Sequence, residues 1–186
     1  MSRTATISKK SIIDAAIEIL RENGAEAVNA RSIAARLGCS TQPIFSNFAT
    51  MDDLQSEVIK SAYELYFGFL SDEAKSEKYP KYKSFGMAYI RFAKEEKELF
   101  KLLFMRDRNG EELIPTPDFE ESTKLIMNAT GASREKAHLL HLEMWISVHG
   151  IATMLATSFF EPEWELISDM ISDIYQGLKT RLIEGK

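Results

Sequence analysis

The stretch ARSIAARLGCSTQPIFSNF, from Ala30 to Phe48, has the pattern of two short helices joined by a tight turn. Helices that cross at a steep angle need small or apolar residues at their inner positions. Gly38 can adopt the left-handed conformation that such a turn requires without a steric penalty. The inner positions of the stretch are all small or apolar: Ile33, Ala34, Leu37, Cys39, Ile44 and Phe48. The stretch therefore predicts a helix-turn-helix.

The outer side of the second short helix carries short polar side chains, one aromatic ring and no acidic residue. Threonine, glutamine and asparagine can exchange hydrogen bonds with base edges in the major groove, and the free amides at a helix N-terminus suit a phosphate oxygen. Pro43 is tolerated in a first helical turn. A plain hairpin of two helices with a solvated polar face is the structural alternative. The residues that we assign to DNA binding are Asn29, Arg31, Ser40, Thr41, Gln42, Pro43, Phe45, Ser46 and Asn47.

Helical periodicity recurs along the rest of the chain, and strand patterns are nearly absent. We expect an all-α fold of about nine helices, with an N-terminal three-helix domain over residues 1–50 and a larger helical body over residues 51–186. Segment 107–118 is rich in turn residues and predicts a loop. The expected helix boundaries are marked by Asn23-Gly24, Asn29, Ser40, Thr50 or Met51, Pro80, Glu96, Met105, Pro117, Thr130-Gly131, Ser133, Ser158 and Pro162.

Composition and charge are those of an ordinary globular protein. The 186 residues include 45% hydrophobic and 27% charged residues, and the net charge is −5. Residues 1–50 carry a local charge of +2 and the remainder carries −7. The N-terminal domain could therefore face phosphates while the helical body is repelled by them. One cysteine, no apolar stretch of membrane-spanning length and no secretory signal at the start predict a cytoplasmic protein without membrane association.

The segment from Ile12 to Leu54 resembles the DNA-binding domain of the TetR family of transcription regulators. The resemblance covers Ile13-x-Ala15-Ala16-x-x-x-Leu20, Gly24, Asn29-x-x-x-Ile33-Ala34, Leu37-Gly38-Cys39-Ser40, Ile44-Phe45-x-Asn47-Phe48 and Asp53-Leu54. It implies three helices for DNA, a fourth as connector and the rest forming a ligand pocket and a dimer interface. Two short segments, Leu99–Met105 and Met144–Gly150, resemble a subgroup with a Trp-His-Gly signature in its ligand-binding part.

Three positions depart from the family's usual pattern. Phe45 stands where the family usually has tyrosine, Asn47 where it often has histidine or tyrosine, and Met51 where it usually has lysine. Each loss of a hydroxyl or a positive charge removes a contact to phosphate, which weakens DNA binding and its salt dependence. The cationic N-terminal side chains of Arg3, Lys9 and Lys10 could compensate.

The body is rich in methionine and aromatic residues, which form adaptable walls around apolar ligands but which also form ordinary cores. Following the resemblance, our candidates for ligand binding are Tyr63, Phe67, Met87, Phe104, His141, Met144, Trp145 and Val148. The resemblance also implies that the last two helices pair with their mates in a dimer. Our candidates for that interface are Leu142, Ile146, Thr153, Trp164, Ile171, Tyr175 and Leu178.

The function that these patterns favour is ligand-responsive repression. The expected protein is a homodimer that binds a palindromic double-stranded operator and is released by a small apolar or amphipathic effector. The alternative is a helical small-molecule-binding or protein-interaction module without DNA binding, and activation in place of repression leaves no mark in a sequence. His138 and His141 lack a nearby carboxylate or thiolate at ligand spacing, so we expect no metal site. No catalytic motif or cofactor motif is present, so we expect neither an enzyme nor a cofactor.

Overall fold

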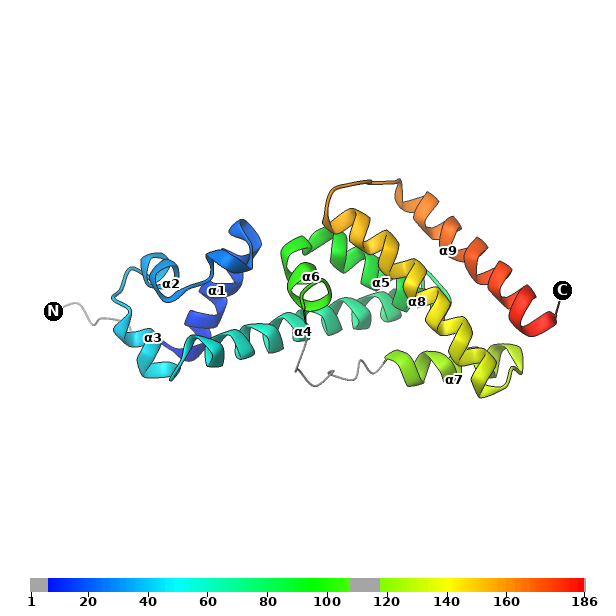
Figure 1. Cartoon of the computed structure of the whole chain (residues 1–186), viewed down its shortest axis with the longest axis horizontal. Coiled ribbons are helices and arrows are strands. Elements are labelled where there is room, and N and C mark those ends of the chain that lie inside the picture. The colour runs from blue at the N-terminus through cyan, green and yellow to red at the C-terminus, as the bar shows by residue number, and fades with distance from the viewer. Residues whose placement is uncertain (1–6, 108–117, 186) are drawn as a thin grey trace. The chain divides into compact units, whose positions relative to one another are not determined.

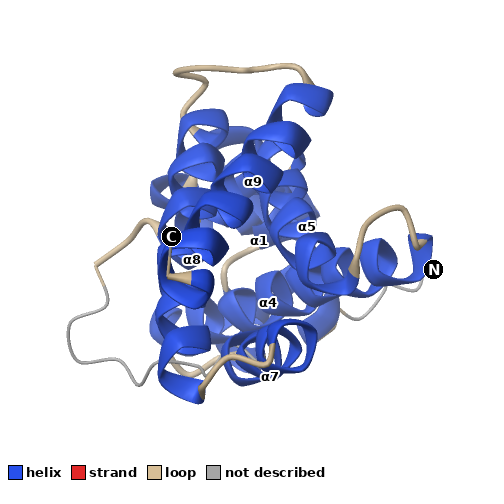
Figure 2. Ribbon diagram, turned by 90° about the vertical axis from the view of Figure 1, so that its right-hand side faces the viewer, coloured by secondary structure: helices blue, strands red, loops and turns tan. Residues whose placement is uncertain are grey.

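The computed structural model describes residues 7–107 and 118–185, and every regular element among them is helical (Figures 1 and 2). Nine α-helices lie in these ranges, which confirms the predicted all-α class. Arg3, Pro117 and nearly all of the predicted loop 107–118 fall outside the described residues. Contacts between residues divide the chain into two compact units, Met1–Tyr66 with Glu96–Arg106 (unit 1) and Phe67–Glu95 with Asp107–Lys186 (unit 2).

Unit 1 holds the first helices of the chain and one that comes much later. These are α1 (Lys9–Asn23), a 3-10 turn (Ala25–Ala27), α2 (Ala30–Leu37), α3 (Gln42–Asn47), the first part of α4 (Met51–Ser76), and α6 (Lys97–Phe104). Apolar side chains of every one of these α-helices are buried in it, among them Ile12, Ala16, Leu20, Ile33, Ile44, Leu54, Val58, Leu99, Phe100 and Leu103. The small core predicted for the helix-turn-helix is thereby confirmed, with Leu37 and Cys39 half-buried at its edge.

Capping side chains fix where the helices of unit 1 begin. The predicted N-cap Asn29 is confirmed, because its side chain accepts hydrogen bonds from the amides of Arg31 and Ser32 in a reciprocal capping box. Thr50 and Asp53 exchange bonds of the same kind ahead of α4, at 2.9 and 3.1 Å. The expected cap Ser40 is wrong: the residue before α3 is Thr41, whose helical backbone leaves α3 without a side-chain cap.

Unit 2 is built around α8 (Arg134–Ala156), which packs against α5 (Lys81–Glu95), α7 (Asp118–Thr130) and α9 (Trp164–Lys179). The predicted cap Ser133 is confirmed, since its hydroxyl accepts from the amide of Lys136. Buried residues recur every three or four positions along α8, at Ala137, Leu140, Met144, Val148, Ala152 and Leu155, which gives the helix one core-facing side. After α9 the chain continues in a π-helical turn, Thr180–Glu184.

Helix α8 is also the one described helix whose length and apolar composition would suffice to cross a membrane. Its packing against three helices and the ion pair of its Glu143 with Arg181, at 2.5 Å, are those of a central helix in a helical body. Its core-facing side chains account for part of this apolar character.

The two compact units differ from the predicted division after residue 50. Helix α4 stays with unit 1 as far as Tyr66, and α6 joins unit 1 although α5 belongs to unit 2. Two contacts explain the position of α6. Glu96, directly before it, pairs with Arg21 of α1, and Phe104 at its end lies edge-on to Tyr66, with ring centroids 5.3 Å apart. The functional boundary at residue 50 stays a prediction.

Candidate nucleic-acid interface and ligand region

The turn between α2 and α3 has the geometry that the sequence predicts. Gly38 has φ 64° and ψ 35°, the left-handed conformation, and closes α2. The amide of Cys39 donates to the carbonyl of Ala34 at 3.0 Å, which satisfies a carbonyl left open by the end of the helix. Ile33 and Ile44 are completely buried and hold the two helices together. Helix α3 is therefore anchored by its inner face, and its other face is free for a partner.

The outer face of α3 presents Gln42, Phe45 and Ser46 to solvent. The Ser46 hydroxyl donates to the carbonyl of Gln42 at 2.9 Å, within the helix. Asn47 is half-buried, and its side-chain amide donates to the carbonyl of Pro43 at 2.8 Å and to that of Ile7 at 3.5 Å. Gln42 thus offers the longest polar side chain of this face, whereas Asn47 ties α3 to the segment before α1. Thr41 and Pro43 are half-buried, and Ser40 is exposed.

Most basic side chains of the N-terminal region are paired with carboxylates. Arg36 binds Glu18 and Glu22, and the hydrogen bond with Glu22 raises the pKa of Arg36 and lowers that of Glu22. Lys10 pairs with Asp14 at 2.6 Å. Lys9 lies 3.7 Å from a carboxylate oxygen of Glu57 and covers the Phe48 ring.

Arg31 differs from these residues in having no carboxylate partner. It is the second residue of α2, it is exposed, and it makes no ion pair within the described part of the chain. Among the N-terminal basic residues that the structure describes, its charge is the one left available to an anion. The sequence does not distinguish Arg31 from Lys9 and Arg36, because the ion pairs of those two residues are formed between helices.

The candidate ligand residues divide between the two units. Tyr63 and Phe104 belong to unit 1, where their rings lie edge-on with centroids 6.3 Å apart. The other candidates lie in unit 2. There Met87, His141, Met144 and Val148 are buried and Phe67 is half-buried. Trp145 is 44% exposed and stacks on His149, with the ring planes 15° apart and the centroids 5.4 Å apart.

His141 forms a polar contact inside unit 2. Its Nδ1 lies 3.0 Å from the hydroxyl of Tyr82 on α5, and its ring lies edge-on to Phe119 on α7, with centroids 4.4 Å apart. Burial, followed by the charge of His138, lowers the pKa of His141 to about 4. Burial also lowers the pKa of His149, whose Nδ1 lies 2.8 Å from the hydroxyl of Tyr89. The imidazoles are therefore neutral near pH 7, and each is oriented by a contact with a tyrosine that the sequence alone did not predict.

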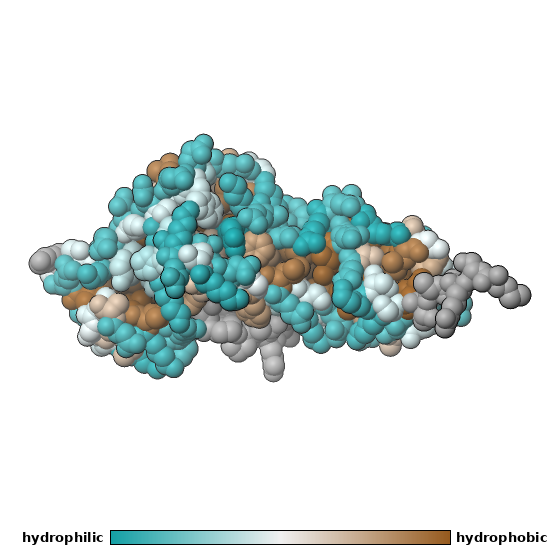
Figure 3. Space-filling model, turned by 180° about the vertical axis from the view of Figure 1, so that it is seen from behind, coloured by the Kyte–Doolittle hydropathy of each residue, from teal (hydrophilic) through white to brown (hydrophobic). Residues whose placement is uncertain are grey.

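The candidate dimer residues have very different exposures. Leu142 and Ile146 on α8 are exposed, at 37% and 57%, whereas Thr153, Trp164, Tyr175 and Leu178 are half-buried. Ile171 is only 3% exposed and packs within its own unit, so it has little surface left for a partner. The sequence reading missed further exposed apolar residues of α8, α9 and the segment between them: Leu139, Met154, Phe159, Phe160, Leu166 and Met170. On the face drawn in Figure 3, polar residues cover most of the surface and apolar residues show between them.

Comparison with known proteins finds two family models that span about three quarters of the chain between them. Residues 12–58 match the model of bacterial regulatory proteins of the tetR family. Residues 82–173 match the model of the tetracyclin repressor-like C-terminal domain. The match does not name the Trp-His-Gly subgroup, so that assignment stays a prediction. No curated protein matches the chain in sequence.

Solved structures share the fold at low sequence identity. A TetR-like transcriptional regulator from Rhodococcus sp. RHA1 is 13% identical, with a TM-score of 0.63 over 95% of this chain and 96% of that one. A TetR family member from Streptomyces coelicolor is 18% identical, with a TM-score of 0.61 over 89% and 96%. The multidrug binding protein EbrR, solved with imidazole, is 18% identical, with a TM-score of 0.60 over 89% and 93%. With both family models matched along the chain, the protein belongs to the TetR family of DNA-binding transcription regulators, which are typically not enzymes.

Proposed function

We propose that the chain is a repressor that binds a palindromic operator as a homodimer and leaves it when a small apolar or amphipathic molecule binds to the body. The observation that carries the DNA-binding part is the outer face of α3, anchored from behind by Ile44 and presenting Gln42 beside exposed Phe45 and Ser46. A glutamine side chain can form a bidentate pair with adenine in the major groove. Two such helices about 34–36 Å apart enter successive major grooves of one palindrome.

Within this proposal the contact set remains the predicted one, from Asn29 and Arg31 through Ser40, Thr41, Gln42, Pro43, Phe45, Ser46 and Asn47. We assign different tasks to three of its members. Gln42 reads bases, Arg31 contacts phosphate with its unpaired charge, and Asn47 positions α3 through its bond to the carbonyl of Ile7, in the segment before α1. The predicted domains, 1–50 for DNA and 51–186 for ligand binding and dimerisation, are part of the proposal.

The DNA-binding part is tested by electrophoretic mobility shift with the DNA upstream of the protein's own gene, over a series of salt concentrations. Replacing Arg31 by alanine removes one phosphate contact per protomer, so the logarithmic salt dependence of a dimer's binding should fall by about 2. Arg36→Ala is the matched control on the same helix, because the charge of Arg36 is already paired with Glu18 and Glu22.

Specific, salt-sensitive retention by the unmodified chain, weakened by Arg31→Ala and changed less than twofold by Arg36→Ala, supports the proposal. If the chain retains its own upstream DNA no better than unrelated DNA, the proposed operator binding fails and a helical module without DNA binding takes its place. Equal losses from both arginine variants would contradict the assignment of the phosphate contact to Arg31.

The dimer part of the proposal is supported by apolar side chains that the protomer leaves exposed on its last two helices. Leu142 and Ile146 on α8, with Leu166 and Met170 on α9, are each at least 36% exposed. Apolar side chains that together form a contiguous exposed patch are typical of an association surface. A second copy of the chain would remove these side chains from water. The dimer would also fix the distance between the two α3 helices, which makes a palindromic sequence the preferred site.

The ligand response is supported by the aromatic and methionine side chains within unit 2 and by the likeness to a multidrug binding protein. A ligand releases the protein from DNA only if it binds more tightly to the arrangement of the two DNA-binding domains that does not fit the operator. To change the operator from almost fully occupied to almost fully free, the ligand must bind the non-binding arrangement about 10⁴-fold more tightly than the DNA-binding one. We further propose that the protein acts in the cytoplasm and has no catalytic activity of its own.

A further inference from the structure

His141 has an unused polar atom in the interior of unit 2. The side chain lies on α8 where α5 and α7 pack against that helix, and it is only 7% exposed. Its Nδ1 is engaged by the Tyr82 hydroxyl at 3.0 Å, whereas its Nε2 is buried and has no hydrogen-bond partner among the described residues. A buried polar atom without a partner is costly, so such an atom calls for an explanation.

The contact with Tyr82 determines which nitrogen of His141 carries the hydrogen. The described residues give the Tyr82 hydroxyl no hydrogen-bond partner except Nδ1 of His141. A phenol is the stronger donor and an imidazole nitrogen the stronger acceptor, and the opposite arrangement would leave the buried hydroxyl hydrogen unused. The Tyr82 hydroxyl therefore donates to Nδ1, and Nε2 carries the hydrogen. His141 offers an N–H donor to the interior of the unit.

Ser122 supplies a second unused group from the facing helix. It lies on α7, which packs against α8, and it is 1% exposed. Its hydroxyl has no partner among the described residues, although serine in a helix commonly bonds back to a carbonyl of the preceding turn. The neighbouring Thr123 does so, donating to the carbonyl of Phe119 at 2.8 Å. One donor on α8 and one hydroxyl on α7 are thus both buried and both unused.

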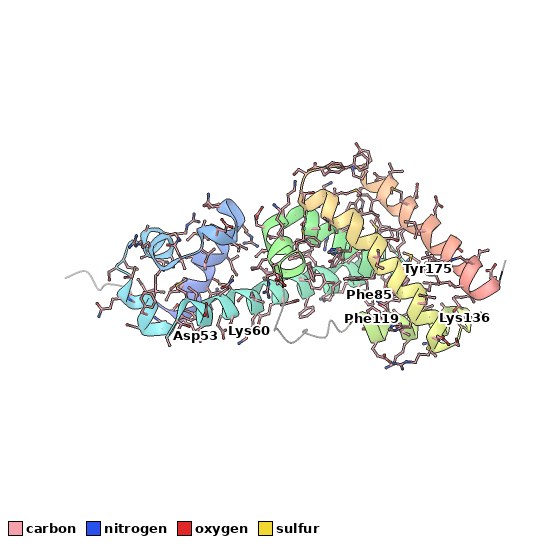
Figure 4. The ribbon with its side chains drawn as sticks, in the orientation of Figure 1. Asp53, Lys60, Phe85, Phe119, Lys136 and Tyr175 are labelled. Atoms are coloured by element: carbon pink, nitrogen blue, oxygen red, sulfur yellow. The ribbon has the colours of Figure 1, made fainter. Side chains whose placement is uncertain are left out.

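The surroundings of His141 are aromatic. Phe119 lies 4.4 Å from its ring, and Tyr82 lies 5.8 Å from both His141 and Tyr175 of α9, measured between ring centroids. Figure 4 labels Phe119 on α7 and Tyr175 on α9. Lys81, on the same turn of α5 as Tyr82, is already paired with Glu121 at 2.7 Å. An apolar molecule suits these walls, because the side chains of Phe119, Tyr82 and Tyr175 carry no positive charge.

We propose that His141 and Ser122 hold a neutral small molecule that carries a hydrogen-bond acceptor, such as a carbonyl oxygen, on an apolar frame. The inference rests on the proposed ligand response and names the chemical class of the effector. With the pKa of His141 lowered to about 4 by burial, the ring is neutral at pH 7. A carboxylate would therefore meet a neutral donor, and it would lose its hydration without gaining an opposite charge.

Acetophenone and α-methylstyrene test the proposal as a matched pair, because the second replaces the carbonyl oxygen of the first by a methylene group. Isothermal titration of the full-length protein should give acetophenone roughly tenfold tighter binding than α-methylstyrene, the usual effect of one hydrogen bond. The ratio should fall in His141→Phe, which keeps a ring without nitrogen and leaves only the Ser122 hydroxyl as a donor. It should persist in His138→Phe, the matched change at an exposed histidine one turn away.

Nitrogen NMR of the unmodified protein tests the proposal without depending on whether a variant folds. Saturating acetophenone should shift the Nε2–H resonance of His141 and leave that of His138 unchanged. Equal affinity for the two probes, the same ratio in His141→Phe as in the unmodified protein, or no saturable binding of acetophenone would each overturn the proposal.

A parallel titration of operator binding separates this proposal from the ligand response on which it rests. Acetophenone that binds through His141 but leaves operator affinity unchanged supports the site and contradicts its role in release. A different compound that releases the His141→Phe variant from DNA as readily as the unmodified protein upholds the ligand response and overturns the site.

Discussion

Gly38 allows a direct test of the turn that orients α3. Its φ of 64° is unfavourable for a residue with a Cβ atom, and a Cβ built there would have no atom within 4 Å. Replacement by alanine therefore costs only the left-handed backbone conformation, about 1–2 kcal/mol. For a chain of this length, a loss of that size lowers the melting temperature by roughly 2–8 °C.

Two matched variants separate the backbone effect from the effect of adding a methyl group. Gly38→Asn should lose less stability than Gly38→Ala, because asparagine adopts the left-handed conformation more readily. Gly68 lies within α4 and also has no atom within 4 Å of a built Cβ. Gly68→Ala should therefore raise the free energy of unfolding by about 1 kcal/mol, since alanine is the better helix former.

Thermal and urea denaturation followed by far-ultraviolet circular dichroism measure all three variants. Trp145 and Trp164 both belong to unit 2, so tryptophan fluorescence would not report directly on the turn. The expected order of stability is Gly68→Ala, unmodified protein, Gly38→Asn, Gly38→Ala. Equal stability of the two Gly38 variants, or a gain in stability from Gly38→Ala, would refute the reasoning from the left-handed turn.

Three further predictions concern other parts of the chain. The two-point contact between Arg21 and Glu96, at 2.8 and 2.6 Å, should give a coupling of about 0.5–1 kcal/mol in a double-mutant cycle of unfolding, and zero coupling would contradict its role in holding α6. Folding lowers the pKa of His141 to about 4, so between pH 6.5 and 4 its imidazole is protonated in the unfolded chain but not in the folded one. The free energy of unfolding should therefore keep its full value above about pH 6.5 and decline as the pH falls towards 4. Urea titrations across that range should show about 1–3 kcal/mol of this decline disappearing in His141→Phe. Ile146→Lys should shift the protein towards monomer in light scattering, with Glu135→Lys on the same helix as the charge control, and an unchanged dimer would exclude this face of α8.

The parts of the fold that the sequence predicts well are governed by neighbouring residues. Helix α2 begins and ends where Asn29 and Gly38 predict, because an N-cap side chain and a left-handed glycine act within one helical turn. Ser133 marks the start of α8 for the same reason. Ser40 failed as a cap because Thr41 already adopts helical backbone angles, so no side chain caps the start of α3. The choice between adjacent polar residues depends on backbone geometry that composition does not reveal.

The features that escaped the sequence depend on contacts between distant residues. Tyr82 and His141 are 59 positions apart, and no periodic pattern links them. The placement of α6 in unit 1 likewise follows from its contacts with α1 and with Tyr66. Among the candidate dimer residues, Ile146 is exposed and Ile171 is buried, although both fit an apolar helical stripe. Periodicity identifies an apolar face but does not show whether the same protomer or a partner covers it.

The positive charge that residues 1–50 can offer to DNA also depends on contacts that the sequence does not reveal. The sequence gives this region a surplus of two positive charges, yet Arg36, Lys10 and Lys9 each lie within 4 Å of a carboxylate oxygen. Paired cations contribute little to the attraction of phosphates, because their field is largely cancelled at the distance of a DNA strand. Arg31 is thus left with a larger share of the attraction than the charge count implies. If the proposed operator binding holds, discrimination between DNA sequences comes mainly from the polar face of α3, and the salt dependence of binding reports largely on Arg31.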